Sequence, residues 1–110
     1  MSNSIEERIS QIEHDLIGRW LNELIAIFFD GTDSVGGFGI MRIGVPNLSI
    51  AYSVKYRVLI DPMGSEYVVV TFIHEGTEKD MKYKIVTLDR HQRMLILEPP
   101  ENGPMVTFGK

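Results

Sequence analysis

Hydrophobic residues recur at two different spacings along this chain, and the change in spacing divides it into two parts. The first part has the three-to-four-residue spacing of an α-helix, set by Ile5, Ile9, Ile12 and Leu16. Ser4 and Glu7 have the spacing of a capping box, which is typical of a helix start. We therefore predict an amphipathic helix over residues 4–16, with its apolar stripe packed on another part of the molecule.

The segment that follows, residues 17–29, permits two interpretations. Extending the apolar stripe would give one long helix from Ser4 to Phe29, lying on an open antiparallel sheet. Gly18 would weaken that helix by about 1 kcal/mol relative to alanine, and the β-branched and aromatic residues after Leu24 suit a strand. Asp30-Gly31 indicates a hairpin after a strand, although Gly31 could also end a helix. We favour a strand over residues 17–29 and keep the helix as the alternative.

The second part of the chain alternates between apolar and polar residues, which is typical of strands with one buried face. The alternation is cleanest over residues 48–60, a length that suggests a bend or break near Lys55. Pro46-Asn47 breaks the run before it, and residues 76–80 read as a charged turn. Other strands are predicted over residues 35–43, 66–75, 81–88, 93–98 and 105–108.

The glycine-rich stretch around Phe38 contains Gly36, Gly37 and Gly39. Glycines inside a strand indicate a bulge, strong curvature or the close approach of another group. They do not form a dinucleotide-binding fingerprint, because the spacing differs and no helix pattern follows. We therefore interpret them as structural.

One helix and about seven strands joined by tight turns predict a mainly β protein. The most direct way to pair the sheet edges is a small antiparallel up-and-down β-barrel with an N-terminal amphipathic helix. Residues 1–110 would form a single domain, with the helix over 4–16 and antiparallel strands over 17–109.

The composition narrows the functional classes. The 110 residues include 11 Lys and Arg against 15 Asp and Glu, a net charge of −4 that predicts neither a nucleic-acid nor a membrane partner. The chain has no cysteine, which removes disulfides and thiolate chemistry. The first ten residues are polar and acidic, unlike a signal peptide, and no apolar run approaches the length of a membrane span. We expect a cytoplasmic protein.

Two short motifs carry a resemblance to a known family. Gly18-x-Trp20 precedes an apolar run and Asp30-Gly31-Thr32, and residues 83–88 and 94–97 read as paired closing strands. In these features the chain resembles the small lipocalin-like domains. The resemblance implies an up-and-down barrel, with Trp20 plugging the closed end and an apolar cavity reached from the other end. It also implies a late basic residue stacked on the tryptophan, for which Arg93 and Lys110 are the candidates.

The sequence offers little for catalysis. His14, His74 and His91 lie far apart and lack metal-ligand spacing, so we predict no metal and no cofactor. No serine has the surroundings of a nucleophile elbow. An enzyme on this scaffold would need polar residues inside the barrel, and Arg19, Asn22 and Glu23 are the first to inspect. We lean towards a non-catalytic protein.

The aromatic residues form the candidate binding set. A plain hydrophobic core is the alternative explanation for them, because side chains can fill the interior of a small barrel. Tyrosine hydroxyls need partners when buried, so two tyrosines four residues apart on one strand would suit the polar fringe of an apolar pocket. The hypothesised ligand-binding residues are Trp20, Phe28, Phe38, Tyr52, Tyr56, Phe72 and Tyr83.

These observations lead to two expectations about function. The first is non-catalytic binding of a small apolar or amphipathic ligand inside a lipocalin-like barrel, driven by burial of apolar area. The second is a protein-interaction or assembly module that contacts a protein partner or a second copy of the chain. It would use the helix stripe, or the sheet face that bears Tyr67, Val69 and Ile73.

Overall fold

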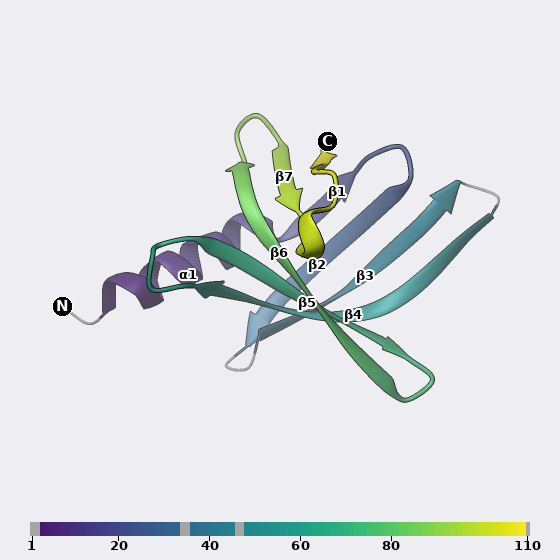
Figure 1. Ribbon diagram of the computed structural model, residues 1–110, viewed down its shortest axis with the longest axis horizontal. Coiled ribbons are helices and arrows are strands. Elements are labelled where there is room, and N and C mark those ends of the chain that lie inside the picture. Colours follow the sequence, from purple (N-terminus) through teal and green to yellow (C-terminus); the bar gives the residue numbers. More distant parts are fainter. Residues whose placement is uncertain (1–2, 34–35, 46–47, 110) are drawn as a thin grey trace.

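The computed structural model describes residues 3–33, 36–45 and 48–109, which form one helix followed by eight antiparallel strands (Figure 1). The elements are α1 (Asn3–Leu16), β1 (Gly18–Leu21), β2 (Ile25–Asp33), β3 (Gly36–Val45), β4 (Leu48–Ile60), β5 (Glu66–His74), β6 (Thr77–Asp89), β7 (Met94–Glu98), the 3-10 helix η1 (Pro100–Asn102) and β8 (Val106–Phe108).

Each strand pairs with the next one along the chain, so the sheet has the order β1 to β8. The two outer strands then meet. The Leu21 amide donates to the Gly109 carbonyl at 3.1 Å, and the Gly109 amide donates to the Leu21 carbonyl at 2.7 Å. This bridge nearly closes the sheet, and the predicted mainly β up-and-down barrel is confirmed.

The helix is confined to the first part of the chain. α1 begins at Asn3, so Ser4 lies inside its first turn and is not the residue that precedes it. It ends at Leu16, and Gly18 has a φ of +123°, a value that residues with side chains rarely adopt. The alternative of one long helix to Phe29 is therefore wrong.

Residues 17–29 form two strands where one was predicted. The Asn22 side-chain oxygen accepts hydrogen bonds from the Leu24 amide at 2.9 Å and the Ile25 amide at 2.7 Å. The Asn22 amide in turn donates to the Ile25 carbonyl at 2.9 Å. This asparagine turn reverses the chain between β1 and β2 without glycine or proline.

The predicted hairpin at Asp30-Gly31 is also wrong, because β2 continues through it to Asp33. The pairing with β3 shifts register between Phe29 and Thr32, so Asp30 and Gly31 form a bulge. The predicted break at Pro46-Asn47 and the predicted strand start at Val35 lie outside the described residues.

Two glycines of β3 allow close approach, as the sequence suggested. A Cβ atom at Gly37 would overlap the ring of Tyr56, which lies opposite it on β4. A Cβ atom at Gly39 would overlap the backbone carbonyl oxygen of Phe28 on β2. β3 therefore packs against its neighbours because these positions have no side chain.

The remaining strands follow the predicted alternation, with two differences. β4 runs unbroken from Leu48 to Ile60, so of the predicted bend or break near Lys55 the break is absent, and Lys55 pairs with β3 on one side and β5 on the other. β6 begins at Thr77, so the predicted charged turn over residues 76–80 belongs largely to a strand. Lys79, a charged residue on the inner face between the outward Glu78 and Asp80, hid the alternation there.

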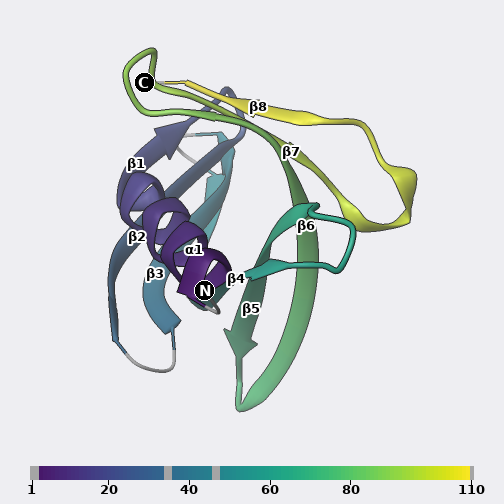
Figure 2. The ribbon, with the colours of Figure 1, turned by 90° about the vertical axis from the view of Figure 1, so that its left-hand side faces the viewer.

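α1 lies across one end of the barrel. Figure 2 shows the helix between β1–β3 on one side and β5–β6 on the other, and α1 contacts β2, β4 and β6. Ile12 and Leu16 on its apolar stripe are 1% and 0% exposed and pack in one cluster with Trp20, Phe29 and Tyr56. We call this the covered end, and the opposite end of the barrel the open end.

Candidate ligand-binding site

The covered end is packed and its polar groups are satisfied. Trp20 is 3% exposed, and its indole nitrogen donates to the Leu16 carbonyl at the end of α1, at 2.9 Å. The Tyr56 hydroxyl donates to the Asp30 carbonyl in the β2 bulge. The Tyr56 ring meets the Phe29 ring edge-on, with centroids 4.6 Å apart. The covered end is therefore hydrophobic core.

Arg90, in the turn between β6 and β7, holds the end of α1. One of its guanidinium nitrogens donates to the carbonyls of Ile17 at 3.0 Å, Asp15 at 3.2 Å and His14 at 3.4 Å. These carbonyls lie where a helix runs out of internal donors, and a cation there also complements the helix dipole. Arg90 is therefore the basic residue near the end of the chain that contacts the segment leading to Trp20, and it binds backbone carbonyls there rather than the tryptophan ring.

The candidates named from the sequence for that position do not match this placement. Arg93 is exposed and lies at the end of the same turn, with a φ of +58°. Lys110 lies outside the described residues. The prediction missed Arg90 because the resemblance pointed to stacking on Trp20, whereas the contact made is with carbonyl oxygens.

A second polar contact anchors the first half of α1. The Arg8 guanidinium donates to both carboxylate oxygens of Glu66 at the start of β5, at 2.6 Å and 3.3 Å. The hydrogen bond to Glu66 raises the pKa of Arg8. The pair is bidentate, which gives the contact a defined geometry, and it is partly exposed to solvent.

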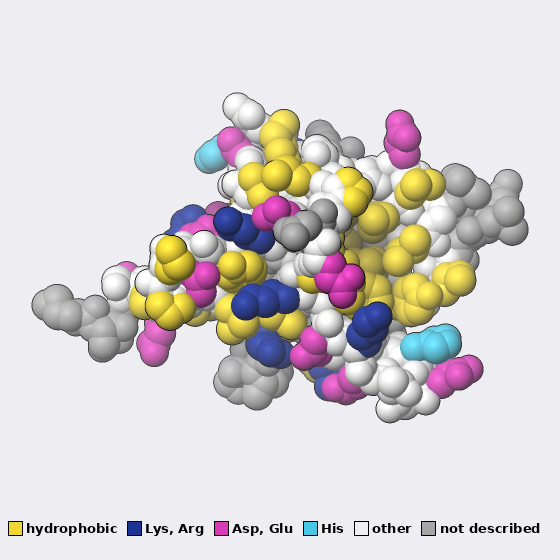
Figure 3. All heavy atoms as spheres, viewed as in Figure 1, with side chains coloured by type: hydrophobic (Ala, Val, Ile, Leu, Met, Phe, Trp, Pro, Cys, Tyr) yellow, Lys and Arg dark blue, Asp and Glu magenta, His cyan; other side chains and the backbone are white. Residues whose placement is uncertain are grey.

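The open end contains a hollow of about 650 Å³ between the β3–β4 side and the β5–β6 hairpin. Figure 3 shows hydrophobic side chains gathered there, bordered by basic and histidine side chains. The hollow is within the size range of small-molecule sites. Its lining residues are Ile43, Tyr52, Phe72, His74, Glu75, Thr77, Lys79, Met81 and Tyr83.

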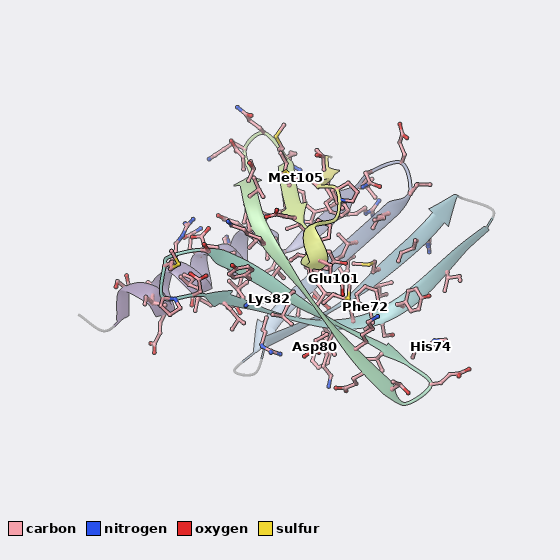
Figure 4. All side chains as sticks on the ribbon, in the orientation of Figure 1. Phe72, His74, Asp80, Lys82, Glu101 and Met105 are labelled. Carbon is pink, nitrogen blue, oxygen red and sulfur yellow. The ribbon has the colours of Figure 1, made fainter. Side chains whose placement is uncertain are left out.

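Aromatic rings form the main wall of this hollow. The Tyr52 ring lies 5.6 Å from the Phe72 ring and 5.9 Å from the His74 ring, measured between centroids. Both pairs are tilted rather than stacked, at interplanar angles of 55° and 67°. Phe72 and His74 follow one another on the inner face of β5, with His74 nearer the hairpin tip (Figure 4). Burial raises the pKa of Tyr83, which keeps this phenol neutral.

The charged and ionisable side chains that line the hollow lie near the tip of the β5–β6 hairpin. Lys79 lies on β6 directly opposite Phe72, so its side chain shares the inner face with the aromatic wall. His74 and Glu75 lie at the tip, with 4.0 Å between the imidazole nitrogen and the carboxylate oxygen. These two side chains are 67% and 85% exposed, so water screens their interaction strongly.

The structure separates the seven hypothesised ligand-binding residues into three groups. Tyr52, Phe72 and Tyr83 line the hollow at the open end. Trp20 and Tyr56 are buried at the covered end as core, which is the alternative that the sequence left open.

The last two aromatic residues point away from the interior. Phe28 and Phe38 are 43% and 52% exposed on the outside of the barrel, so their assignment to an interior pocket is wrong. Phe29, not Phe28, faces inward, and the glycines around Phe38 give no alternation from which its direction could be read. Sequence reasoning missed six of the lining residues, Ile43, His74, Glu75, Thr77, Lys79 and Met81.

The polar residues proposed for inspection as a catalytic cluster do not gather inside the barrel. Arg19 is exposed on β1, Glu23 is exposed in the turn after it, and Asn22 is engaged with backbone amides of that turn. Over the described ranges, no group of three or more His, Cys, Asp or Glu side chains could hold a metal ion.

The two surfaces that the sequence suggested for a partner, the helix stripe and one sheet face, are partly buried in the structure. Ile12 and Leu16 of the helix stripe are buried, whereas Ile9 is partly buried and Ile5 is 54% exposed. Val69, in the middle of the sheet face proposed for a partner, is 4% exposed. In the part of the chain that the structure describes, no helix is both long and apolar enough to cross a membrane.

No family model, no curated protein and no solved structure matches this chain.

Proposed function

We propose that this protein binds a small apolar or amphipathic molecule, without catalysis, in the hollow at the open end of a lipocalin-like barrel. The observation that carries the proposal is the wall of Tyr52, Phe72 and Tyr83 around a hollow of about 650 Å³. The eight-stranded up-and-down order and the tryptophan at the helix-covered end support the lipocalin-like class.

Burial of apolar surface would supply most of the affinity. A bicyclic aromatic ligand that buries about 250 Å² of apolar surface gains about 6 kcal/mol at 25 cal/mol per Å². Taken alone, such a gain would give a dissociation constant of roughly tens of micromolar, and the freedom that the ligand loses on binding weakens the affinity from that limit. The hollow is open to solvent on one side, so we expect rapid exchange of ligand.

A fluorescence titration with the neutral dye N-phenyl-1-naphthylamine tests the proposal. We expect saturable binding of one dye per chain with increased emission. Met81→Trp would fill the hollow and weaken binding at least several-fold. Met63→Trp is the matched control, because Met63 is 91% exposed in the turn before β5 and should bind dye as the natural chain does.

Absence of saturable binding to the natural chain would contradict the proposal. Equal binding by the two tryptophan variants, with unchanged melting temperatures, would also contradict it by placing the dye outside the hollow.

Self-association is the second candidate function, and the outer face of β1–β3 favours it. Phe28 and Ile40 lie opposite one another in register there and are 43% and 52% exposed. The exposed Arg19 and Arg42 lie on the same outer face. The exposed start of α1, with Ile5 beside Glu6 and Glu7, has the complementary combination of apolar and acidic groups.

We propose under this second candidate that the outer face contacts the first turn of α1 on a second copy. Sedimentation velocity at low ionic strength should then show concentration-dependent association. Ile40→Ser should abolish it, and Ile50→Ser, at a similarly exposed isoleucine on β4, should not. A monomer at all concentrations would exclude this candidate.

A further inference from the structure

The inner faces of β5 and β6, which form one wall of the hollow, carry one side chain with a fixed charge. Along β5 and β6 the inner face carries Val68, Val70, Phe72 and His74 from one strand, and Thr77, Lys79, Met81 and Tyr83 from the other. The other charged residues of β6 up to Lys84 alternate with these and point outward. Among these inner-face residues, Lys79 is therefore the only side chain with a fixed charge.

The neighbours of Lys79 show why its position matters. It is the cross-strand partner of Phe72, one pair inward from the hairpin tip, and so stands between the aromatic wall and solvent. The outward charges beside it are engaged elsewhere: Glu78 pairs with Lys55 at 3.1 Å, and Asp80 accepts a hydrogen bond from Thr71 at 2.7 Å. A lysine stem can lie along apolar surface while its ammonium stays in water.

The shape of the wall restricts what an apolar group in the hollow can look like. Tyr52 contacts Phe72 on one side and His74 on the other, at centroid distances of 5.6 Å and 5.9 Å. Tilted rings at these distances offer edges and faces to another ring, an arrangement that aromatic groups favour beyond simple burial. A flat ring system therefore gains contacts here that a puckered aliphatic ring of equal size does not.

We propose that the preferred ligands are planar aromatic molecules that carry one anionic group, with the ring among Tyr52, Phe72 and Tyr83 and the anion at Lys79. This inference rests on the proposed function and names the ligand class of that same site. Glu75 at the hairpin tip opposes an anion there, so the anionic group would lie further inward, at Lys79 beside the aromatic wall.

Displacement of bound N-phenyl-1-naphthylamine by matched competitors tests the charge requirement. At low ionic strength we expect 2-naphthoate to compete about fivefold better than its neutral analogue 2-naphthamide, as an exposed ion pair allows. The preference should shrink at high salt. Lys79→Gln should remove this preference, which is measured as the ratio of the two competitors' affinities within the same variant. Lys84→Gln, an equal loss of charge on the outer face of β6, should preserve it.

A third competitor tests the requirement for planarity. Decahydro-2-naphthoate has the carbon skeleton and charge of 2-naphthoate but puckered rings, and we expect it to compete about threefold less well. Equal or better competition by the saturated acid would overturn the aromatic part of the proposal.

The outcomes separate this inference from the function on which it rests. If the neutral dye does not bind the natural chain, the binding function itself fails. If the dye binds but 2-naphthoate and 2-naphthamide compete equally, the anion preference is overturned while the binding function stands. An equal loss of preference in the Lys79→Gln and Lys84→Gln variants would assign the effect to net charge and overturn the role of Lys79.

Discussion

The two ends of this barrel are built from the same alternating strands but have opposite interiors. On β4, Tyr56 lies at the covered end, where the Phe29 ring and the bulge carbonyl of Asp30 surround it. Tyr52, four residues earlier on the same face, lines a hollow. The difference comes from α1, which supplies Ile12 and Leu16 to one end only. An added element, rather than the strand sequence, decides which end is core.

The largest expected effect follows from removing the contribution of α1. Leu16→Ala should lower the free energy of unfolding by about 2–5 kcal/mol, because Leu16 is 0% exposed and a cavity would remain. Ile43→Ala, which truncates a partly exposed side chain at the open end, should cost about 1 kcal/mol or less. Chemical denaturation of both variants measures the contrast, and equal losses would show that the two ends are equally packed.

The next effect tests the close packing at Tyr56. Gly37→Ala should destabilise the fold by about 1–3 kcal/mol, because the new methyl group overlaps the Tyr56 ring. Gly31→Ala in the β2 bulge is the control, since a Cβ atom there meets nothing within 4 Å. Thermal unfolding of the two variants tests this. A Gly37→Ala variant with the melting temperature of the natural chain would contradict the close packing.

Alkaline pH should also test the packing of Tyr56. Burial, followed by the nearby Glu13 and Asp30 carboxylates, raises the pKa of Tyr56 to about 12 from an ordinary value of 10.0. A raised pKa in the folded state means that the stabilisation is complete below about pH 10 and is lost as the pH rises towards 12.

The measurement is stability against pH for two chains. The natural chain should lose stability between pH 10 and 12, and Tyr56→Phe should show a flatter profile. Identical slopes for Tyr56→Phe and the natural chain would contradict the assignment.

The smallest effect concerns the cap at the end of α1. Arg90→Ala should cost about 0.5–1 kcal/mol, because the guanidinium is exposed and water can replace it at the carbonyls. Arg93→Ala, three residues later and exposed, should change stability by less than about 0.5 kcal/mol. Amide hydrogen exchange near the end of α1 should become faster only in the Arg90→Ala variant. Equal exchange rates in the two variants would contradict the proposed capping role of Arg90.

Much of the architecture could be predicted because its signals are local. The three-to-four-residue spacing gave α1, and the clear alternation over residues 48–60 gave β4 with its inward face. The turn between β1 and β2 was missed because a single side chain, Asn22, makes it where glycine or proline was expected. β6 was shortened because Glu78, Lys79 and Asp80 were read as a turn.

The site was harder to predict because it depends on which end α1 occupies. Tyr52 and Tyr56 have equivalent positions in the sequence pattern, and only the packed helix makes one core and the other lining. Phe28 and Phe29 are adjacent, so their pattern alone could not say which of them faces inward. Lys79 could be recognised as a lining residue only from its cross-strand pairing with Phe72, which the sequence does not reveal.

The bridge between Leu21 and Gly109 has a consequence for how this molecule comes apart. Two backbone hydrogen bonds join the first strand to the last part of the chain, whereas neighbouring strands share ladders of three to nine paired positions. We expect the wall to part along this seam before any other, leaving two unpaired strand edges. Crosslinking the seam should therefore slow aggregation on heating more than an equal constraint placed between β4 and β5.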